Sequence, residues 1–319
     1  VGGVEETITV AATSPVVDVQ SITQRTVMTR DVLDSVPTGR NIQAVGIMIP
    51  GTSIAAGGGG ALSRDVGGSG GMQQSPLQFR GSGDTVMTIE GIRLNNLCAQ
   101  GAYSGVYWND GSFQELSYVT GADSAEMGQG GMRVNMVPKD GGNQFKGSLT
   151  GNWAGESFTA SNLRDNLAGD LTYNKSNRLT NVGNIQKVWD LNPSIGGPIL
   201  KDKIWFNYTF RSWGVYKYVA DAYYDSNPSP FVFTADTSRP GIDDGYIFSN
   251  VGRIAAQATS KDKISVYFDK QQKYRNHWGI SATTPPEAAG VQVTPSNYVG
   301  VGKWTRTQSS RLLLEGGFG

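Results

Sequence analysis

The spacing of apolar and polar positions predicts two short helices in the first part of the chain. Residues 29–36 place their apolar side chains on one helical face, Thr29 is the expected N-cap, and Pro37 ends the helix. Residues 41–49 show the same spacing, with Asn41 as the N-cap, and a Pro-Gly pair stops the pattern. The sequence therefore predicts a helix, a turn and a second helix in succession.

The region that follows predicts a small sheet. Residues 77–80, 85–90 and 91–95 read as short strands separated by turns. Residues 52–74, just before them, contain several glycine clusters and few apolar anchors, so we expect a mobile loop there. No Gly-Lys-Ser or Gly-Lys-Thr follows these glycines, which argues against a phosphate-binding loop.

Beyond residue 146 the pattern changes to strict alternation. Residues 203–211 and 263–269 each place apolar side chains on one face and mostly polar side chains on the other, and each begins at a Lys-Asp-Lys turn. In contrast, residues 220–244 and 279–297 are long stretches rich in turn-forming residues. Short turns that alternate with long loops are typical of outer-membrane β-barrels.

A soluble β-sandwich or propeller is the alternative for this second part, because such folds also alternate and also contain many aromatic residues. The two possibilities differ in where the apolar face points. A sandwich hides that face between two sheets, whereas a membrane barrel turns it outward to lipid, with Trp and Tyr at the rims of the apolar band.

Composition narrows the functional classes. The chain has 319 residues, enough for two or more domains, and its 27 Lys and Arg balance 27 Asp and Glu, so no net charge favours a nucleic-acid partner. Cys98 is the only cysteine, which excludes an internal disulfide and a cysteine zinc site, and we expect it to be a small, semi-buried side chain. His277 is the only histidine, so we expect no enzyme, no metal site and no cofactor.

Length also restricts the barrel. The longest nearly apolar run, residues 42–50, is far shorter than the roughly 20 residues of a spanning helix. Residues 144–319 supply six to eight strands of about ten residues each, and a barrel of eight strands has room only for its own side chains. We therefore expect part of a larger barrel, from the front portion of a longer protein.

Several motifs resemble TonB-dependent outer-membrane receptors. Residues 30–51 look like the start of their plug domain, and residues 113–147 look like its end. Residues 194–206 closely match the G-G-P-I-x-K-D-K hairpin of the Oar-like branch. The matching residues at the end of the plug are Glu115, Gly121, Ala125, Glu126, Gly128, Lys139, Gly141, Gly142 and Asn143.

The first residues of the chain resemble the TonB box of this family. Residues 5–12 alternate β-branched and polar side chains, as an extended strand does. The resemblance implies that they pair with a TonB-like energy transducer in the periplasm by β-augmentation. An ordinary linker strand is the alternative. The residues concerned are Glu6, Thr7, Ile8, Thr9, Val10 and Ala11.

The resemblance also implies latches between plug and barrel, because plug arginines of the family pair with barrel glutamates. Arg80, which precedes a glycine as in the family's R-G segment, and Arg93 in the adjoining strand are the candidates. An arginine that faces water in the lumen is the alternative. Thr120 stands where many members carry another arginine, so one latch is missing.

Together these features predict a mainly β protein: a small α+β plug domain followed by antiparallel strands of a truncated large transmembrane β-barrel. The expected divisions are a TonB box-like tail at 1–15, a plug at 16–143 and barrel strands at 144–319. The resemblance implies a Gram-negative outer membrane location and active transport of an unidentified extracellular substrate. The alternatives are a structural or adhesive outer-membrane component and a soluble β-rich binding protein.

Overall fold

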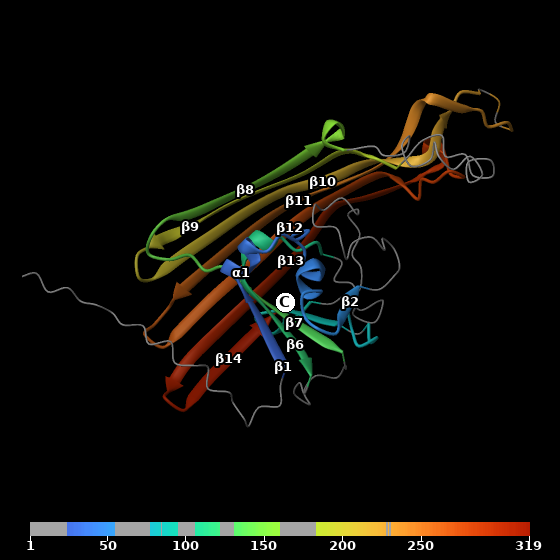
Figure 1. The fold of residues 1–319 in the computed structure, drawn as a ribbon. Coiled ribbons are helices and arrows are strands. Elements are labelled where there is room, and N and C mark those ends of the chain that lie inside the picture. The colour runs from blue at the N-terminus through green and yellow to red at the C-terminus, as the bar shows by residue number, and fades with distance from the viewer. Residues whose placement is uncertain are drawn as a thin grey trace, which may run out of the picture.

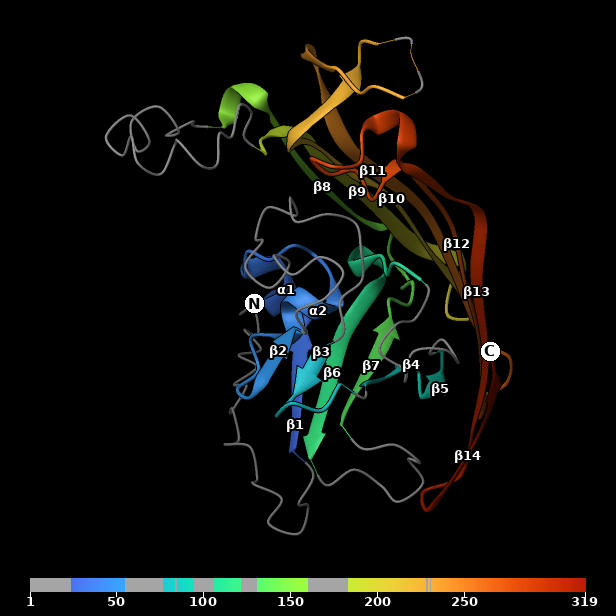
Figure 2. The same ribbon diagram turned by 90° about the vertical axis from the view of Figure 1, so that its right-hand side faces the viewer.

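The computed structural model describes residues 24–54, 77–83, 85–94, 106–121, 131–159, 183–227, 229 and 231–319. They form a small domain that lies in the hollow of a long curved sheet (Figures 1 and 2). We call the described residues before residue 146 the plug and the curved sheet the wall. The expected TonB box-like residues 6–11, together with Cys98, Ala125, Glu126 and Gly128, lie outside the described residues.

Both predicted helices form. α1 (Arg30–Ser35) begins after Thr29, and α2 (Ile42–Gly46) begins after Asn41. The side chain of Asn41 accepts a hydrogen bond from the backbone N–H of Ala44 at 2.7 Å, which satisfies one free donor of the helix end. α2 is shorter than its sequence pattern, because the backbone after Gly46 closes into tighter turns.

The plug is built on a five-stranded sheet in the order β1-β6-β7-β4-β5. β4 and β7 run parallel, and the other neighbours are antiparallel. A separate pair, β2 and β3, forms inside and after the segment that was expected to be a loop, so β3 does not pair with β4. The strands are β1 (Gln24–Thr29), β2 (Thr52–Ile54), β3 (Leu77–Phe79), β4 (Thr85–Ile89), β5 (Ile92–Arg93), β6 (Phe113–Gly121) and β7 (Met132–Pro138).

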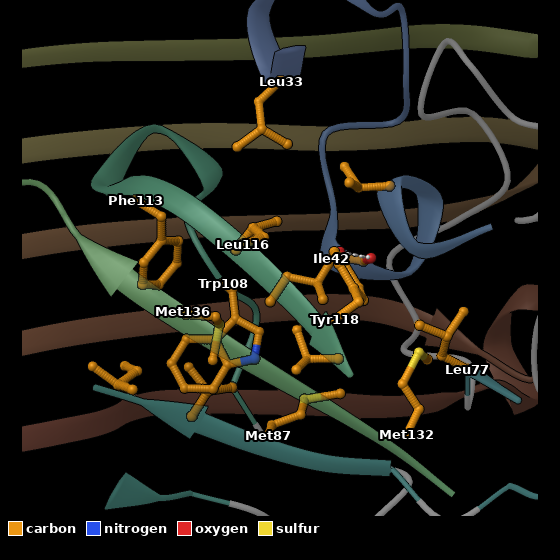
Figure 3. Packing of buried hydrophobic residues seen from close by; sticks show 14 of the residues in the cluster. Leu33, Ile42, Leu77, Met87, Trp108, Phe113, Leu116, Tyr118, Met132 and Met136 are labelled. Atoms are coloured by element: carbon orange, nitrogen blue, oxygen red, sulfur yellow. Dashed lines mark hydrogen bonds between the residues drawn. The ribbon is translucent and has the colours of Figure 1, made fainter. Parts of the chain in front are cut away.

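The plug core joins strands β4, β6 and β7 to the two helices (Figure 3). Tyr118 is fully buried there, and its hydroxyl donates to the carbonyl of Ile42 at 2.9 Å, which ties α2 to the sheet. Burial raises the pKa of Tyr118, so this hydroxyl keeps its proton. Phe113 stacks on Tyr267 of the wall with ring centroids 6.2 Å apart, and this contact continues the core into the wall.

The wall is an open sheet of seven strands, each antiparallel to the next. Short turns lie at one end of the sheet, and longer connections, which include the short helical turns η4 (Glu156–Phe158) and η6 (Pro286–Ala288), lie at the other. The strands are β8 (Lys146–Gly155), β9 (Ile185–Leu200), β10 (Ile204–Asp225), β11 (Ala235–Gln257), β12 (Asp262–Trp278), β13 (Gly290–Ser309) and β14 (Leu312–Phe318).

The apolar face of the wall points away from the plug. On β12, Ile264, Val266 and Phe268 are 44%, 54% and 46% exposed, whereas Tyr267 and Asp269 between them are fully buried. A sandwich would show the opposite arrangement, with the apolar face covered by a second sheet. The fold is therefore that of a partial membrane barrel around a plug. No helix of the described residues has the length and hydropathy that a membrane crossing needs.

An aromatic row crosses the outward face of the wall toward its long-connection end. Tyr246 lies beside Tyr274 and Trp189, with ring centroids 5.0 and 6.5 Å apart, and Tyr216 packs on Trp189 at 5.5 Å. From Ile264 to Tyr274 the strand rises about 33 Å, which becomes roughly 25 Å of height at the usual barrel tilt. That height is comparable to the apolar band of outer-membrane barrels. On this face of β12 the run of aliphatic and aromatic side chains ends at Phe268, and Lys270 and Gln272 lie between Phe268 and the aromatic row.

We expect a charge on the outward face to destabilise the inserted protein. Phe268→Arg should lower the free energy of unfolding from lipid vesicles by about 2–4 kcal/mol, because an outward arginine near the bilayer midplane loses its hydration. The matched control is Phe231→Arg, since Phe231 is 93% exposed in the connection between β10 and β11 and should tolerate the change within about 0.5 kcal/mol. Equal effects of the two substitutions would contradict an outward lipid face.

Candidate functional site: the contact between plug and wall

Two wall cations hold two plug carboxylates near the short-turn end of the wall. Arg253 contacts Glu90 through Nη2 at 2.7 Å and Asp140 through Nε at 2.6 Å. Lys263 adds a contact of 2.6 Å to the second oxygen of Asp140, and the hydroxyl of Ser265 lies 3.5 Å from Glu90. The side chain of Arg253 is only 4% exposed, so these contacts replace its hydration.

The plug backbone brings these two carboxylates together. Glu90 lies in the turn between β4 and β5 with a left-handed φ of 51°, and its N–H donates to Met136 of β7. Asp140 follows β7, the parallel neighbour of β4, so both acids leave the same edge of the sheet. Burial opposes the ionisation of Asp140, but Arg253 and Lys263 outweigh it and hold the pKa of Asp140 below its ordinary value.

A second charged cluster centres on Asp110 in the turn η3 (Asp110–Ser112). Three guanidinium groups surround its buried carboxylate: Arg30 at 3.5 Å, Arg40 at 3.7 Å and Arg211 of the wall at 3.6 Å. Arg211 is held by two hydrogen bonds to Asp190 of the wall at 3.0 and 2.7 Å, and also donates to the carbonyl of Arg40 at 3.0 Å. Asp190, a wall residue, therefore holds the guanidinium of Arg211 in the orientation that contacts the plug.

The turn η3 also fits closely against β9. The amide of Asn192 donates to Asn109 at 3.0 Å and to Asp110 at 3.2 Å. A Cβ added to Gly111 would lie 2.6 Å from the Asn192 side-chain oxygen, so only glycine allows this approach. A small residue therefore sets the distance between plug and wall here.

Tyr107, three positions before η3, is held by side chains of β12. Gln271 of β12 accepts from the N–H of Tyr107 at 2.8 Å and donates to the carbonyl of the same residue, while Asp269 receives a hydrogen bond from the Gln271 amide at 2.7 Å. Lys273 donates to the Tyr107 hydroxyl and lies 4.5 Å from its ring centre. Burial raises the pKa of Tyr107 to about 12, so the hydroxyl stays protonated.

The exit from plug to wall explains the K-x-G-G-N motif. The side-chain oxygen of Asn143 accepts from the N–H of Asp202 at 2.9 Å and from the indole of Trp205 at 2.7 Å, which ties the exit to the β9–β10 turn. Gly141 lies against the backbone of Phe206, where a Cβ would collide. Both roles are structural, and they depend on residues that are far apart in the sequence.

The predicted latch residues lie elsewhere on the plug. Arg80 is exposed with a φ of 50°, and its guanidinium lies 5.1 Å from the ring centre of Phe79. Arg93 is exposed at the end of β5. The latch role of both arginines stays a prediction. Of the plug motif, Glu115 and Gly121 lie within β6, near Thr29 and Gln24 of β1.

Among the described residues, the ion pairs that join plug and wall run from wall cations to plug acids, the reverse of the expected polarity. Sequence reasoning missed Glu90, Asp110 and Asp140. The sequence did contain a signal for the wall side of these ion pairs. Arg211 and Arg253 fall on the polar positions of alternating strands, so both arginines must face the lumen. The same part of the chain holds no cluster of three or more His, Cys, Asp or Glu placed to bind a metal ion.

Comparisons with known proteins agree with this arrangement. A segment of 95 residues, 29% of this chain, is 32% identical to the TonB-dependent transporter Oar of Myxococcus xanthus and covers 8% of that protein. No protein-family model matches the chain.

Solved structures show the fold. The outer membrane transporter YddB from Escherichia coli matches with a TM-score of 0.60 and 12% identity, over 89% of this chain and 37% of that one. The alcaligin outer membrane receptor FauA from Bordetella pertussis matches with 0.57 and 14%, over 93% and 38%, and the siderophore receptor PirA from Acinetobacter baumannii with 0.51 and 17%, over 90% and 37%. The chain spans less than two fifths of each of these structures.

We expect Arg253→Gln to loosen the plug. The substitution leaves two plug carboxylates without their buried cation, which costs about 3–5 kcal/mol when one partner of such a pair is removed. Hydrogen exchange of residues 85–94 and 131–138 in the full-length protein measures the loss. The control is Arg306→Gln, because Arg306 pairs with Asp262 inside the wall, and equal exchange in the two variants would contradict the assignment.

Acid should loosen the same contact. The pKa of Asp140 is lower in the folded protein than its ordinary value of 3.8, so its stabilisation is fully present above pH 3.8 and is lost as pH falls through the folded value. Exchange of residues 131–138, corrected for intrinsic rates, should rise in that window. Asp140→Asn should remove this pH dependence, whereas Asp31→Asn on the exposed side of α1 should retain it.

Proposed function

We propose, from the premise that this chain is an Oar-like TonB-dependent receptor of the outer membrane, that the whole protein actively transports a large substrate. In this proposal the inner-membrane TonB complex acts on residues 6–11 through a TonB-like partner, and the plug then shifts against the wall. The substrate comes from outside the cell or leaves it, and it meets the long connections of the wall.

The observation that carries the proposal is the polar character of the contact between plug and wall. Arg253, Arg211 and Gln271 hold the plug by charges and hydrogen bonds, groups that water can satisfy when the plug moves. An interface of continuous apolar packing would instead expose apolar surface at every displacement. The contact also has an apolar part, because Phe113 stacks on Tyr267 and the plug core extends to Val251 and Val301 of the wall, so this surface must separate when the plug moves.

The topology of the plug gives a route for force. β1 is an edge strand of the plug sheet, and it is the first described element after the TonB box-like segment. It pairs with β6, and β6 begins directly after η3, where Asp110 and Tyr107 contact the wall. A pull on the N-terminal segment would therefore reach the contacts with Arg211 and Gln271 through one ladder of hydrogen bonds.

The experiment measures plug movement in cells without knowledge of the substrate. Ser112 is buried at the contact, so Ser112→Cys, in a background where Cys98 and any cysteine outside this segment are replaced by Ser, gives a single thiol that a membrane-impermeant maleimide reaches only when the plug shifts. We expect labelling of the full-length protein to rise at least tenfold when TonB and the proton gradient are present. Deletion of residues 5–12 should abolish that rise.

A point substitution tests whether residues 5–12 act by pairing their backbone with the TonB-like partner or simply by being present. Ile8→Pro removes a backbone donor and should abolish energised labelling, whereas Ile8→Val keeps the extended backbone and should retain it. Labelling that depends on neither TonB nor residues 5–12 would reject active transport and favour a structural or adhesive role. A chain that stays soluble without detergent would reject both.

A further inference from the structure

The wall carries a cluster of donors whose charged partners all belong to the plug. Every carboxylate that lies within 4.0 Å of Arg253 or Lys263 among the described residues is Glu90 or Asp140. Ser265, which precedes Tyr267 on the same face of β12, points its hydroxyl at Glu90 as well. We call Arg253, Lys263 and Ser265 the wall donor cluster.

Arg211, Arg275 and Lys303, three other inward cations of the wall, have carboxylate partners on the wall itself. Arg211 binds Asp190, Arg275 binds Asp243 through two contacts of 2.8 Å, and Lys303 binds Glu315 at 3.0 Å. These pairs survive when the plug moves. The wall donor cluster differs, because its charge balance depends on a domain that the proposed function displaces.

One donor of the cluster has no partner even with the plug in place. Nη1 of Arg253 is buried and makes no hydrogen bond within the described part of the chain. The side chain that carries it is 96% buried, so the group is held without water. A guanidinium presents five N–H donors in a planar fork that suits an oxyanion, and the plug uses only part of that capacity.

The two plug acids leave together. Glu90 and Asp140 follow neighbouring strands of one sheet, and Glu90 is bonded through its N–H to Met136 of β7. A shift of this sheet would therefore draw both acids away from the wall donor cluster, and the chain would turn at the exit, because Gly141 and Asn143 stay against the wall. The shift leaves two cations and a hydroxyl on adjacent strands β11 and β12, facing the lumen close to the 258–261 turn.

We infer that the wall donor cluster is a binding site for an oxyanion group of the transported substrate, a carboxylate or a phosphate, which replaces Glu90 and Asp140 when the plug shifts. This inference rests on the proposed function and adds the chemical class of the cargo. The plug acids occupy the site in the resting protein, and the cargo anion competes with them. Charged side chains that line a pore select ions of the opposite sign in the same way.

The test uses the full-length protein in detergent with two probes, inorganic pyrophosphate and citrate. The double variant Glu90→Gln, Asp140→Asn keeps the shape of the plug side chains and removes their charge. Calorimetry should show at least tenfold tighter binding of one or both probes than to the unsubstituted protein at matched ionic strength. Pyrophosphate alone would identify a phosphate site, and citrate alone a carboxylate site.

Two further substitutions locate the binding. Addition of Arg253→Gln to the double variant should weaken binding at least tenfold, and Arg253→Lys should restore part of it. Lys270→Gln on the same strand should have no effect, because Lys270 is exposed on the outward face. A folded double variant that binds neither probe more tightly, or binding that survives Arg253→Gln, would overturn the inference.

The outcome of the probe-binding experiment does not depend on whether the protein transports a substrate. Binding in detergent requires no TonB and no gradient, whereas the maleimide experiment requires both. Loss of energised labelling with intact probe binding would reject the proposed function alone. Intact labelling without probe binding would reject the oxyanion site alone.

Discussion

The alternation of side chains along the wall strands is the constraint on which the rest of the structure depends. Each strand must present apolar residues to hydrocarbon on one face, so every second residue points inward, where polar groups are free to lie. Ile264, Val266 and Phe268 satisfy the outer requirement, and Ser265, Tyr267 and Asp269 fall inward by the same geometry. The wall therefore offers the plug a surface of hydroxyls, amides and charges.

A plug that fits such a surface must supply complementary groups. Its turns do so, because acids at Glu90, Asp110 and Asp140 lie where the backbone approaches the wall. The regular strands of the plug keep its own apolar core around Tyr118 and Phe113. The plug is therefore a folded unit whose turns attach it to the wall by charges, while Phe113 also joins its core to Tyr267 of the wall.

The sequence predicted local features well wherever the cause was local. The helix starts after Thr29 and Asn41, the cap that Asn41 supplies to Ala44 and the alternation of residues 203–211 all depend on residues within a few positions of one another. The pairing of β3 with β2 was not predictable in this way, because a strand chooses its partner across the fold. The expected arginine latches at Arg80 and Arg93 were carried over from a family resemblance and remain predictions.

The sequence by itself determined the two periodicities, the balance of charge and the separation of an apolar from a polar face, because each follows from residue types at fixed spacing. The direction of the apolar face was left open by the sequence, and the folded wall shows that it points outward. Only the tertiary structure decided which charges meet. Arg253 stands 163 positions from Glu90 and 113 from Asp140, and no local pattern joins residues so far apart. Contacts between plug and wall depend on the curvature of a sheet and the docking of a domain, and these arise only when the whole chain is folded.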